Sequence, residues 1–303
     1  MSRYAVIDLG TNTFHLLIAE EGLAGKIKEI FRERRFVKLA EEGIETIGTA
    51  PYRRGLETVQ HFRQVLSAHD VPVEQVRVFG TAALRTASNG PDFIRQVQET
   101  TGIEIRLISG DREAELIYKG VILAVPPTEE RMLIMDIGGG SVEFILADYN
   151  GVLWAQSFPV GVAVLYKTFH RHEPILPEEI GAIHQYLRQH LRPLAEALAR
   201  FPACRLVGAS GTFDVMQFFL GEERSHPLNA TLPVEKFYPF YRQLVKMDDE
   251  ERRSLKGMPL DRVDMIVVAL ILIDVALEMA GIRQITVSAY AMKEGMLFEM
   301  MRG

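Results

Sequence analysis

The stretch AVIDLGTNTFHLLIAE (Ala5–Glu20) is repeated in altered form as LIMDIGGGSVEFILAD (Leu133–Asp148), at an offset of 128 residues. The same offset carries RVFGTA (Arg77–Ala82) onto RLVGAS (Arg205–Ser210). The repeat therefore covers a whole domain and not one short motif. It predicts two similar lobes that face each other across a cleft.

Both halves show the same order of expected elements. A glycine-bearing loop is followed by a short apolar strand, a turn, a third strand, an amphipathic helix and another short strand. In the second half the turn is Asn150-Gly151, which favours a hairpin; in the first half it is EEGLAG. The order βββαβα predicts an α/β protein with mixed sheets covered by helices. The segment Pro126–Glu130 is the expected boundary between domains 1–125 and 126–303.

Composition narrows the class of protein. A hydrophobic content of 48% over 303 residues is enough for the cores of two domains. The net charge of −6 argues against a nucleic-acid partner, because such binding needs clustered Lys and Arg. The single cysteine, Cys204, cannot form an internal disulfide, and the start MSRYAVIDLG lacks the features of a signal peptide. We expect a cytoplasmic protein.

The most apolar segment, Asp264–Gly281, is expected to be a buried core helix. Its uninterrupted apolar run covers only Met265–Ile273, far short of the ~18 residues that a membrane span needs. We therefore expect no membrane partner.

The two glycine loops are candidate phosphate sites. A phosphate needs converging backbone N–H groups without obstructing side chains, and hydroxyl groups add further donors. Each loop alone could be only a tight hairpin turn, but the pair at equal offset favours phosphate binding. A dinucleotide fingerprint fits poorly, because a strand and not a helix follows the glycines. The candidate residues are Asp8, Gly10, Thr11, Asn12, Thr13, Gly138, Gly139, Gly140 and Ser141.

A helix start at Leu107–Glu115 carries several acids, with Ser109 or Asp111 as the expected N-cap. Acids in a first helical turn are ordinarily explained by the helix dipole, and we prefer that explanation for Asp111 and Glu115. Glu113 is the exception. A carboxylate at the mouth of the cleft could orient and deprotonate a water that attacks phosphorus.

Further charged residues are candidates for phosphate and metal contacts. Arg85 follows a strand end and could hold a phosphate in its guanidinium fork; the alternative is a surface arginine. Asp136 and Glu143 flank the second glycine loop, and their carboxylates suit Mg²⁺; the alternative is two isolated solvated acids.

Two other patterns have ordinary explanations that compete with function. The pair His170 and His172 has no third ligand nearby in the sequence, so a solvated loop is preferred over a metal site. A basic run is ordinarily a solvated strand face, and its functional interpretation is a track for an anionic chain that enters the cleft. That run contains Arg32, Arg34, Arg35 and Lys38.

Taken together, the motifs resemble those of the exopolyphosphatase and guanosine pentaphosphate phosphatase (Ppx/GppA) family, within the superfamily of actin, sugar kinases and heat-shock chaperone ATPases. The resemblance covers nearly the whole chain. It rests on VIDLGTNTFHLLIA, GTAALR, ISGDREAELIYKGV, MDIGGGSVEF, VGASGT and VSAYAMKEGML, in that order. The chain looks like the short, two-domain form of that family.

The resemblance implies a fold and a set of site residues. The fold is two ribonuclease-H-like lobes around a cleft, each a mixed five-stranded sheet with helices on both faces. The implied catalytic glutamate is Glu113, the phosphate-contacting arginine is Arg85, and the metal-linked acids are Asp136 and Glu143. A third phosphate loop is implied at Gly208, Ser210, Gly211 and Thr212. The acids and arginine around Glu113 depart from the family pattern, since Arg112 precedes it and Glu115 follows.

These observations lead to one functional hypothesis with two rivals. The leading one is a Mg²⁺-dependent phosphohydrolase that removes the terminal phosphoryl group from inorganic polyphosphate, as short chains, or from guanosine pentaphosphate; guanosine tetraphosphate is a further expected ligand. The rivals are a nucleotide- or alarmone-binding regulator and a kinase of the same superfamily. The apolar C-terminal residues Met296, Leu297, Phe298 and Met300 leave two options open: the last helix caps the first lobe, or it contacts a second subunit in a homodimer.

Overall fold

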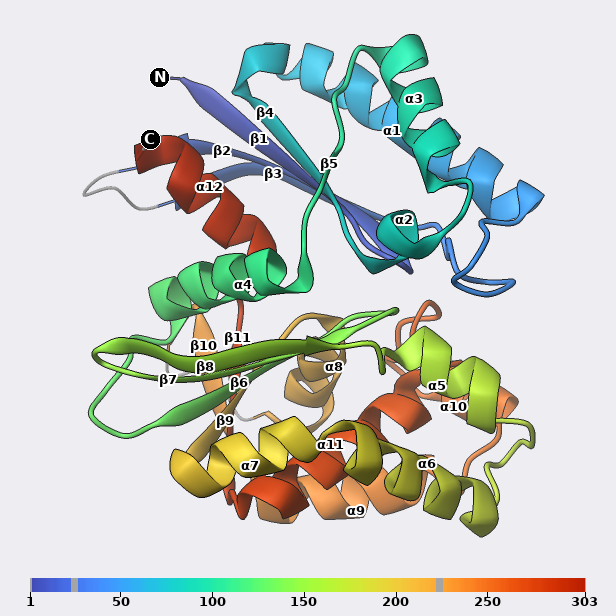
Figure 1. The fold of residues 1–303 in the computed structure, drawn as a ribbon, viewed down its shortest axis with the longest axis vertical. Coiled ribbons are helices and arrows are strands. Elements are labelled where there is room, and N and C mark those ends of the chain that lie inside the picture. The colour runs from blue at the N-terminus through green and yellow to red at the C-terminus, as the bar shows by residue number, and fades with distance from the viewer. Residues whose placement is uncertain (1, 23–26, 222–225, 303) are drawn as a thin grey trace.

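The protein is described by a computed structural model that covers residues 2–22, 27–221 and 226–302, and it contains two sheets (Figure 1). The first sheet has the order β3-β2-β1-β4-β5. Its strands are β1 (Arg3–Leu9), β2 (Thr13–Glu21), β3 (Ile27–Phe36), β4 (Val76–Gly80) and β5 (Arg106–Leu107). β1 pairs antiparallel with β2 and parallel with β4, so the sheet is mixed as expected. Half of the predicted EEGLAG turn, residues 23–25, lies outside the described residues.

The second sheet repeats this topology and adds one strand. Its order is β10-β11-β9-β6-β7-β8, with β6 (Met132–Ile137), β7 (Val142–Asp148), β8 (Gly151–Phe158), β9 (Arg205–Ala209), β10 (Asn229–Pro233) and β11 (Gln284–Ser288). The expectation of five strands is wrong here, because β10 pairs with β11 at the sheet edge and buries Ala230 and Leu232. The predicted hairpin at Asn150-Gly151 is confirmed, and the φ of +124° at Gly151 requires a glycine.

Helices cover the outer face of each sheet (Figure 1). In the first half these are α1 (Thr49–Ala68) and α3 (Gly90–Thr101), with the short η2 (Val73–Gln75) and α2 (Ala82–Thr86) at strand ends. In the second half they are α5 (Val162–Phe169), α6 (Pro177–His190), α7 (Arg192–Arg200), α8 (Gly211–Leu220), α9 (Val234–Leu244), α10 (Asp249–Ser254) and α11 (Ile266–Ala280). The one amphipathic helix expected in the second half is divided into α6 and α7, because Pro193 begins a new helix and cannot continue an old one.

The predicted core helix is α11, and it is buried from Ile266 to Leu277. Its side chains pack with those of β6, β7 and the surrounding helices in one apolar core. Among the described residues, no helix combines the length and the apolar character needed to cross a membrane.

Two helices lie between the sheets: α4 (Gly110–Ala124) and α12 (Met292–Arg302) (Figure 1). They cross at their glycines, where a Cβ added to Gly120 would lie 1.8 Å from the carbonyl oxygen of Ala291. α12 packs on β1 of the first sheet, whereas α4 packs on β7 and β8 of the second. Met296 and Leu297 are buried in this layer, so α12 covers a sheet of its own chain. The boundary at 125/126 stays a prediction.

An ionic network also joins α4 to α12. Arg112 pairs with Glu115 at 2.5 Å and with Glu299, and Lys119 pairs with both glutamates at 2.5 Å. The charges that flank Glu113 in the sequence are therefore engaged on the α12 side of the helix.

Candidate active site

The first hairpin of each half closes through the same glycine contact. The amide of Gly10 donates to the carbonyl of Thr13 at 3.2 Å, and the amide of Gly138 donates to the carbonyl of Ser141 at 3.0 Å. These two amides therefore close the turns and are not free to bind a ligand.

The two turns lie against each other between the sheets. A Cβ added at Gly139 would lie 2.8 Å from Asn12 Cγ, and one added at Gly140 would lie 2.9 Å from Thr11 Oγ1. Such separations are below normal contact, so glycine is what allows the close approach. Gly10 and Gly139 line one and the same cavity, whose volume is about 360 Å³.

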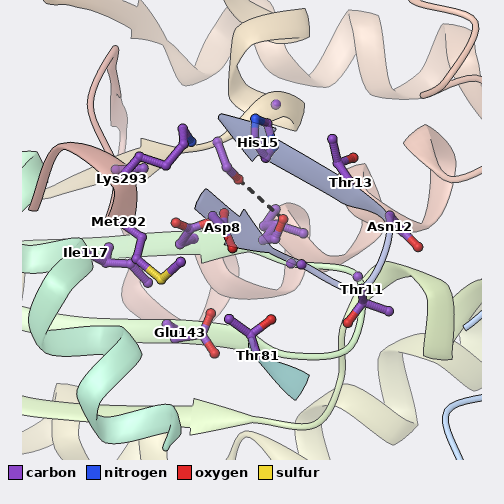
Figure 2. A pocket seen from close by; sticks show the side chains of 18 of the residues that line it. Asp8, Thr11, Asn12, Thr13, His15, Thr81, Ile117, Glu143, Met292 and Lys293 are labelled. Carbon is purple, nitrogen blue, oxygen red and sulfur yellow. Dashed lines mark hydrogen bonds between the residues drawn. The ribbon is translucent and has the colours of Figure 1, made fainter. Parts of the chain in front are cut away.

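Strand pairing directs four side chains into this cavity. Asp8 lies opposite His15 in β1–β2, and Asp136 lies opposite Glu143 in β6–β7. Residues directly opposite in an antiparallel pair project from the same face of the sheet. All four line the cavity, and Figure 2 shows Asp8 between His15 and Glu143.

α4 supplies a further carboxylate. The Ser109 hydroxyl accepts a hydrogen bond from the Arg112 amide at 3.2 Å, which confirms Ser109 as the N-cap and places Glu113 in the first turn. Glu113 is 9% exposed and lines the cavity. Within the described chain its buried Oε2 has no hydrogen-bond partner. We call the four carboxylates Asp8, Glu113, Asp136 and Glu143 the acidic wall.

Burial shifts the acidic wall toward its protonated form. It raises the pKa of Asp8 to about 6, with help from the nearby Asp136 charge. Burial likewise raises the pKa of Glu143 to about 7, although Ser157 donates a hydrogen bond of 2.6 Å to its carboxylate. The pKa of Glu113 lies well above its usual range because of burial and the adjacent charges of Glu143, Asp8 and Asp136. Four acids in one cavity thus favour the presence of a cation.

The raised pKa values predict a stability that depends on pH. Unfolded Asp8 and Glu143 titrate near 3.8 and 4.5. The folded protein therefore holds more protons between these values and about 6 to 7, and its free energy of unfolding falls as pH rises through that window. We expect the melting temperature in EDTA to be higher at pH 5.5 than at pH 8, buffers matched, by about a few degrees.

Glu143→Gln serves as the control for this prediction, since it removes one titrating group and should flatten the pH profile. Mg²⁺ should restore stability at pH 8, because a ligand that binds the folded state stabilises it. A melting temperature that rises steadily from pH 5.5 to pH 8 in EDTA would contradict the prediction.

Basic side chains line the same cavity. We call these residues, Arg32, Arg34, Arg262 and Lys293, the basic wall. Burial and the charges of these cations together hold the pKa of His15 well below its usual value, so His15 is neutral at pH 7. Figure 2 shows Lys293 on the same side of the cavity as Met292, beside Asp8.

Successive side chains of β3 project from opposite faces of the sheet, so the residues of the predicted basic run do not all point the same way. Arg32 and Arg34 line the cavity. Arg35 pairs instead with Glu33 at 2.8 Å. Lys38, beyond the strand, pairs with Asp264 at 2.7 Å. The cavity therefore takes the members of the run that project from one face.

Arg85 lies beside the cavity and not in its lining. Its Nη1 donates to the carbonyl of Ile108 at 2.5 Å, and it lines a smaller adjoining cavity together with Gly140 and Ser141. Its charge nevertheless acts on the acidic wall, because it lowers the pKa of Glu113 and Glu143.

The third predicted loop is brought to the cavity only in part. Ser210 and Gly211 line it, and the Ser210 hydroxyl donates to the carbonyl of Ile137 at 3.3 Å. Gly208 does not, because a Cβ there would lie 2.0 Å from the Phe213 ring; the glycine makes room for core packing. Thr212 is 3% exposed and also lies outside this lining.

The described residues contain no ready-made cluster of metal ligands. Over residues 2–22, 27–221 and 226–302, no three His, Cys, Asp or Glu side chains are grouped closely enough to hold an ion. A Mg²⁺ ion needs less from the protein, since one or two carboxylates with water and substrate phosphates suffice.

The expectation of a solvated loop is wrong for His170, whose side chain is 1% exposed and lies 3.2 Å from Glu173.

Comparison with known families decides the classification. The model of the Ppx/GppA phosphatase family matches residues 17–303. The chain belongs to the Ppx/GppA phosphatase family. The sequence resemblance to this family is thereby confirmed, as is the α/β architecture of two mixed sheets.

Relatives within the Ppx/GppA family include both curated proteins and solved structures. The guanosine-5'-triphosphate,3'-diphosphate pyrophosphatase of Photobacterium profundum is 29% identical over 301 residues, which are 98% of this chain and 59% of the relative. The chain thus spans about six-tenths of that relative's length. The crystal structure of an exopolyphosphatase from Cytophaga hutchinsonii ATCC 33406 is 38% identical, with a TM-score of 0.93 and coverage of 100% and 98%.

A more distant Ppx/GppA structure shares the fold. The Aquifex aeolicus family member is 21% identical, with a TM-score of 0.81 and coverage of 98% of this chain and 97% of that chain. At this identity the likeness concerns the fold alone.

Several cavity residues escaped the analysis of the sequence. Arg262 lies shortly before α11, and Lys293 lies in the late motif VSAYAMKEGML. His15 had a usable signal, since it precedes Glu143 by the repeat offset of 128. Asp214 also lines the cavity, from the first turn of α8.

Proposed function

We propose that this Ppx/GppA family member is a phosphohydrolase that removes the terminal phosphoryl group from a linear phosphoanhydride. The substrate is inorganic polyphosphate or guanosine pentaphosphate. One observation carries the proposal: a single cavity gathers the acidic wall, with carboxylates from both lobes, and the cations of the basic wall. A condensed phosphate chain suits such a cavity, because its oxygens can pair with guanidinium groups and with a cation that carboxylates hold.

Water is the nucleophile in this account. Its oxygen forms a bond to the terminal phosphorus while the bond from phosphorus to the bridging oxygen breaks. Glu113 accepts the proton of the water, and the shortened phosphate chain leaves with the bridging oxygen. The buried Oε2 of Glu113 supports this role, because one carboxylate oxygen has no hydrogen-bond partner among the described residues.

Asp136 and Glu143 are the residues proposed to hold a divalent cation, Mg²⁺ in the first instance. They project from one sheet face in paired register, and both are buried oxygen donors. When bound, the ion supplies positive charge against the phosphate oxygens. Among the chain's own cations, the adjacent Arg85 stabilises charge that develops on the phosphoryl group, and Arg34 and Arg262 pair with oxygens of the rest of the phosphate chain.

Arg112 and Glu115, the charged residues near Glu113 that depart from the family pattern, lie outside the cavity lining. Arg112 and Glu115 engage α12 and each other. The residues that depart from the family pattern therefore contribute to the contact between α4 and α12 and not to the acidic wall.

A substrate panel tests the proposal. We expect phosphate release from polyphosphate or guanosine pentaphosphate in Mg²⁺, with little release from ATP, and a fall of at least about tenfold in EDTA. Tight binding of one of these anions without release would favour the regulator, and phosphate transfer from ATP to an acceptor would favour the kinase.

A further inference from the structure

Asp261 does not line the cavity but contacts two members of the basic wall. Its Oδ1 is 3.3 Å from Arg34 Nη2, and its Oδ2 is 3.9 Å from Arg262 Nε. Arg34 belongs to β3 in the first half, whereas Asp261 and Arg262 precede α11 in the second. One carboxylate therefore bridges the guanidinium groups that the two lobes present to the cavity.

Arg262 is held in place and still has an unused donor. A Cβ at Gly211 would lie 2.1 Å from Arg262 Nη2, so the glycine makes room for the guanidinium. The side chain is 15% exposed, and its buried Nε has no hydrogen-bond partner among the described residues. At 3.9 Å, Asp261 neutralises this cation without a hydrogen bond to it. A phosphate oxygen would fit the open donor better.

Other contacts hold the neighbouring backbone independently of Asp261. Lys38 pairs with Asp264 at 2.7 Å, and the Asn12 side chain donates to the Met265 sulfur at 3.2 Å. The segment 261–265 thus stays attached to the first lobe when the Asp261 side chain rotates. Its carboxylate can leave both arginines at the cost of two long, partly exposed ion pairs.

We propose that Asp261 competes with the inner phosphate groups of a condensed phosphate chain for Arg34 and Arg262. This inference rests on the proposed function, since the terminal phosphate lies at the acidic wall and the next groups lie along the basic wall. Only a chain long enough to reach Arg34 displaces Asp261. The pair Arg34–Asp261 is therefore a specificity determinant that favours longer phosphate chains over pyrophosphate.

Binding measurements test this without any need for turnover. Calorimetric titration uses the Glu113→Gln background in Mg²⁺ at fixed ionic strength, with long-chain polyphosphate and pyrophosphate as probes. Arg34→Gln should weaken polyphosphate binding by about tenfold, the scale of one charge-assisted hydrogen bond. Asp261→Asn should strengthen it by about threefold, the scale of a partly exposed ion pair. Both changes should alter pyrophosphate binding by less than about twofold.

Arg35→Gln is the matched control. Arg35 follows Arg34 on β3, its side chain is 41% exposed against 45%, and it pairs with Glu33 on the other face. We expect its polyphosphate affinity to equal the parent's. Equal losses in Arg34→Gln and Arg35→Gln, weaker binding by Asp261→Asn, or no polyphosphate binding by the parent would each overturn the inference.

The outcome is separate from that of the proposed function. Binding that follows the expected order, in a parent that releases no phosphate, supports the competition and refutes the hydrolase. Phosphate release by the parent without the expected order of affinities supports the hydrolase and refutes the competition by Asp261.

Discussion

Glu113→Gln is expected to lower kcat by about a hundredfold or more and to leave KM nearly unchanged. Glutamine keeps the shape and burial of the side chain but cannot accept the proton of the attacking water. The measurement is steady-state phosphate release, with polyphosphate and with guanosine pentaphosphate, in saturating Mg²⁺.

Glu115→Gln is the control for this change. Glu115 lies on the same helix but pairs with Lys119 and Arg112 on the α12 side. Its loss should leave kcat within about twofold, since surface ion pairs contribute little. Turnover of Glu113→Gln at the parent rate would show that another group acts as the base.

Gly120→Ala is expected to lower the free energy of unfolding by about 2 kcal/mol or more. The added Cβ would lie 1.8 Å from the backbone oxygen of Ala291, and backbone cannot move aside as a side chain can. The loss should appear even though alanine favours a helix interior by ~1 kcal/mol over glycine. Chemical denaturation measures it, and phosphate release should fall as well, because α4 carries Glu113.

Gly181→Ala provides the matched comparison, since no atom lies within 4 Å of a Cβ added at this glycine of α6. There the helix preference acts alone, and we expect a gain of about 0.5 to 1 kcal/mol. Equal stability changes at the two positions would mean that the α4–α12 crossing tolerates a methyl group.

Much of the fold was predictable because the repeat was visible in the sequence. The offset of 128 predicted two sheets of like topology, and the hairpins at both glycine loops follow from local patterns. β10 was not predictable in this way, because its five residues pair with β11, more than fifty positions further along the chain. The packing of α4 on the second sheet and of α12 on the first likewise depends on the tertiary fold. Apolar spacing shows that a helix is buried, but not which sheet buries it.

Part of the candidate site was likewise predictable from the sequence, and part depends on the tertiary fold. The acids Glu113, Asp136 and Glu143 were predicted, and they line one cavity. Asp8 was assigned to a phosphate loop, yet its carboxylate belongs to the acidic wall, as the equal offset to Asp136 could have indicated. Arg262 and Lys293 come from segments that reach the cavity only through the fold. Their roles, like those of the predicted residues, await the experiments above.

The position of α4 determines what moves together. Although α4 precedes the second lobe in sequence, it packs on β7 and β8, and a Cβ on Gly110 at its start would lie 2.4 Å from Ser157 Cβ. If the two sheets rotate against each other, the contacts of α4 with β7 and β8 would carry Glu113 together with Asp136 and Glu143, while Asp8 stays on β1 of the other sheet. The proposed base and the proposed metal-binding pair would then keep their mutual distances, and Asp8 would be the carboxylate whose distance from them changes.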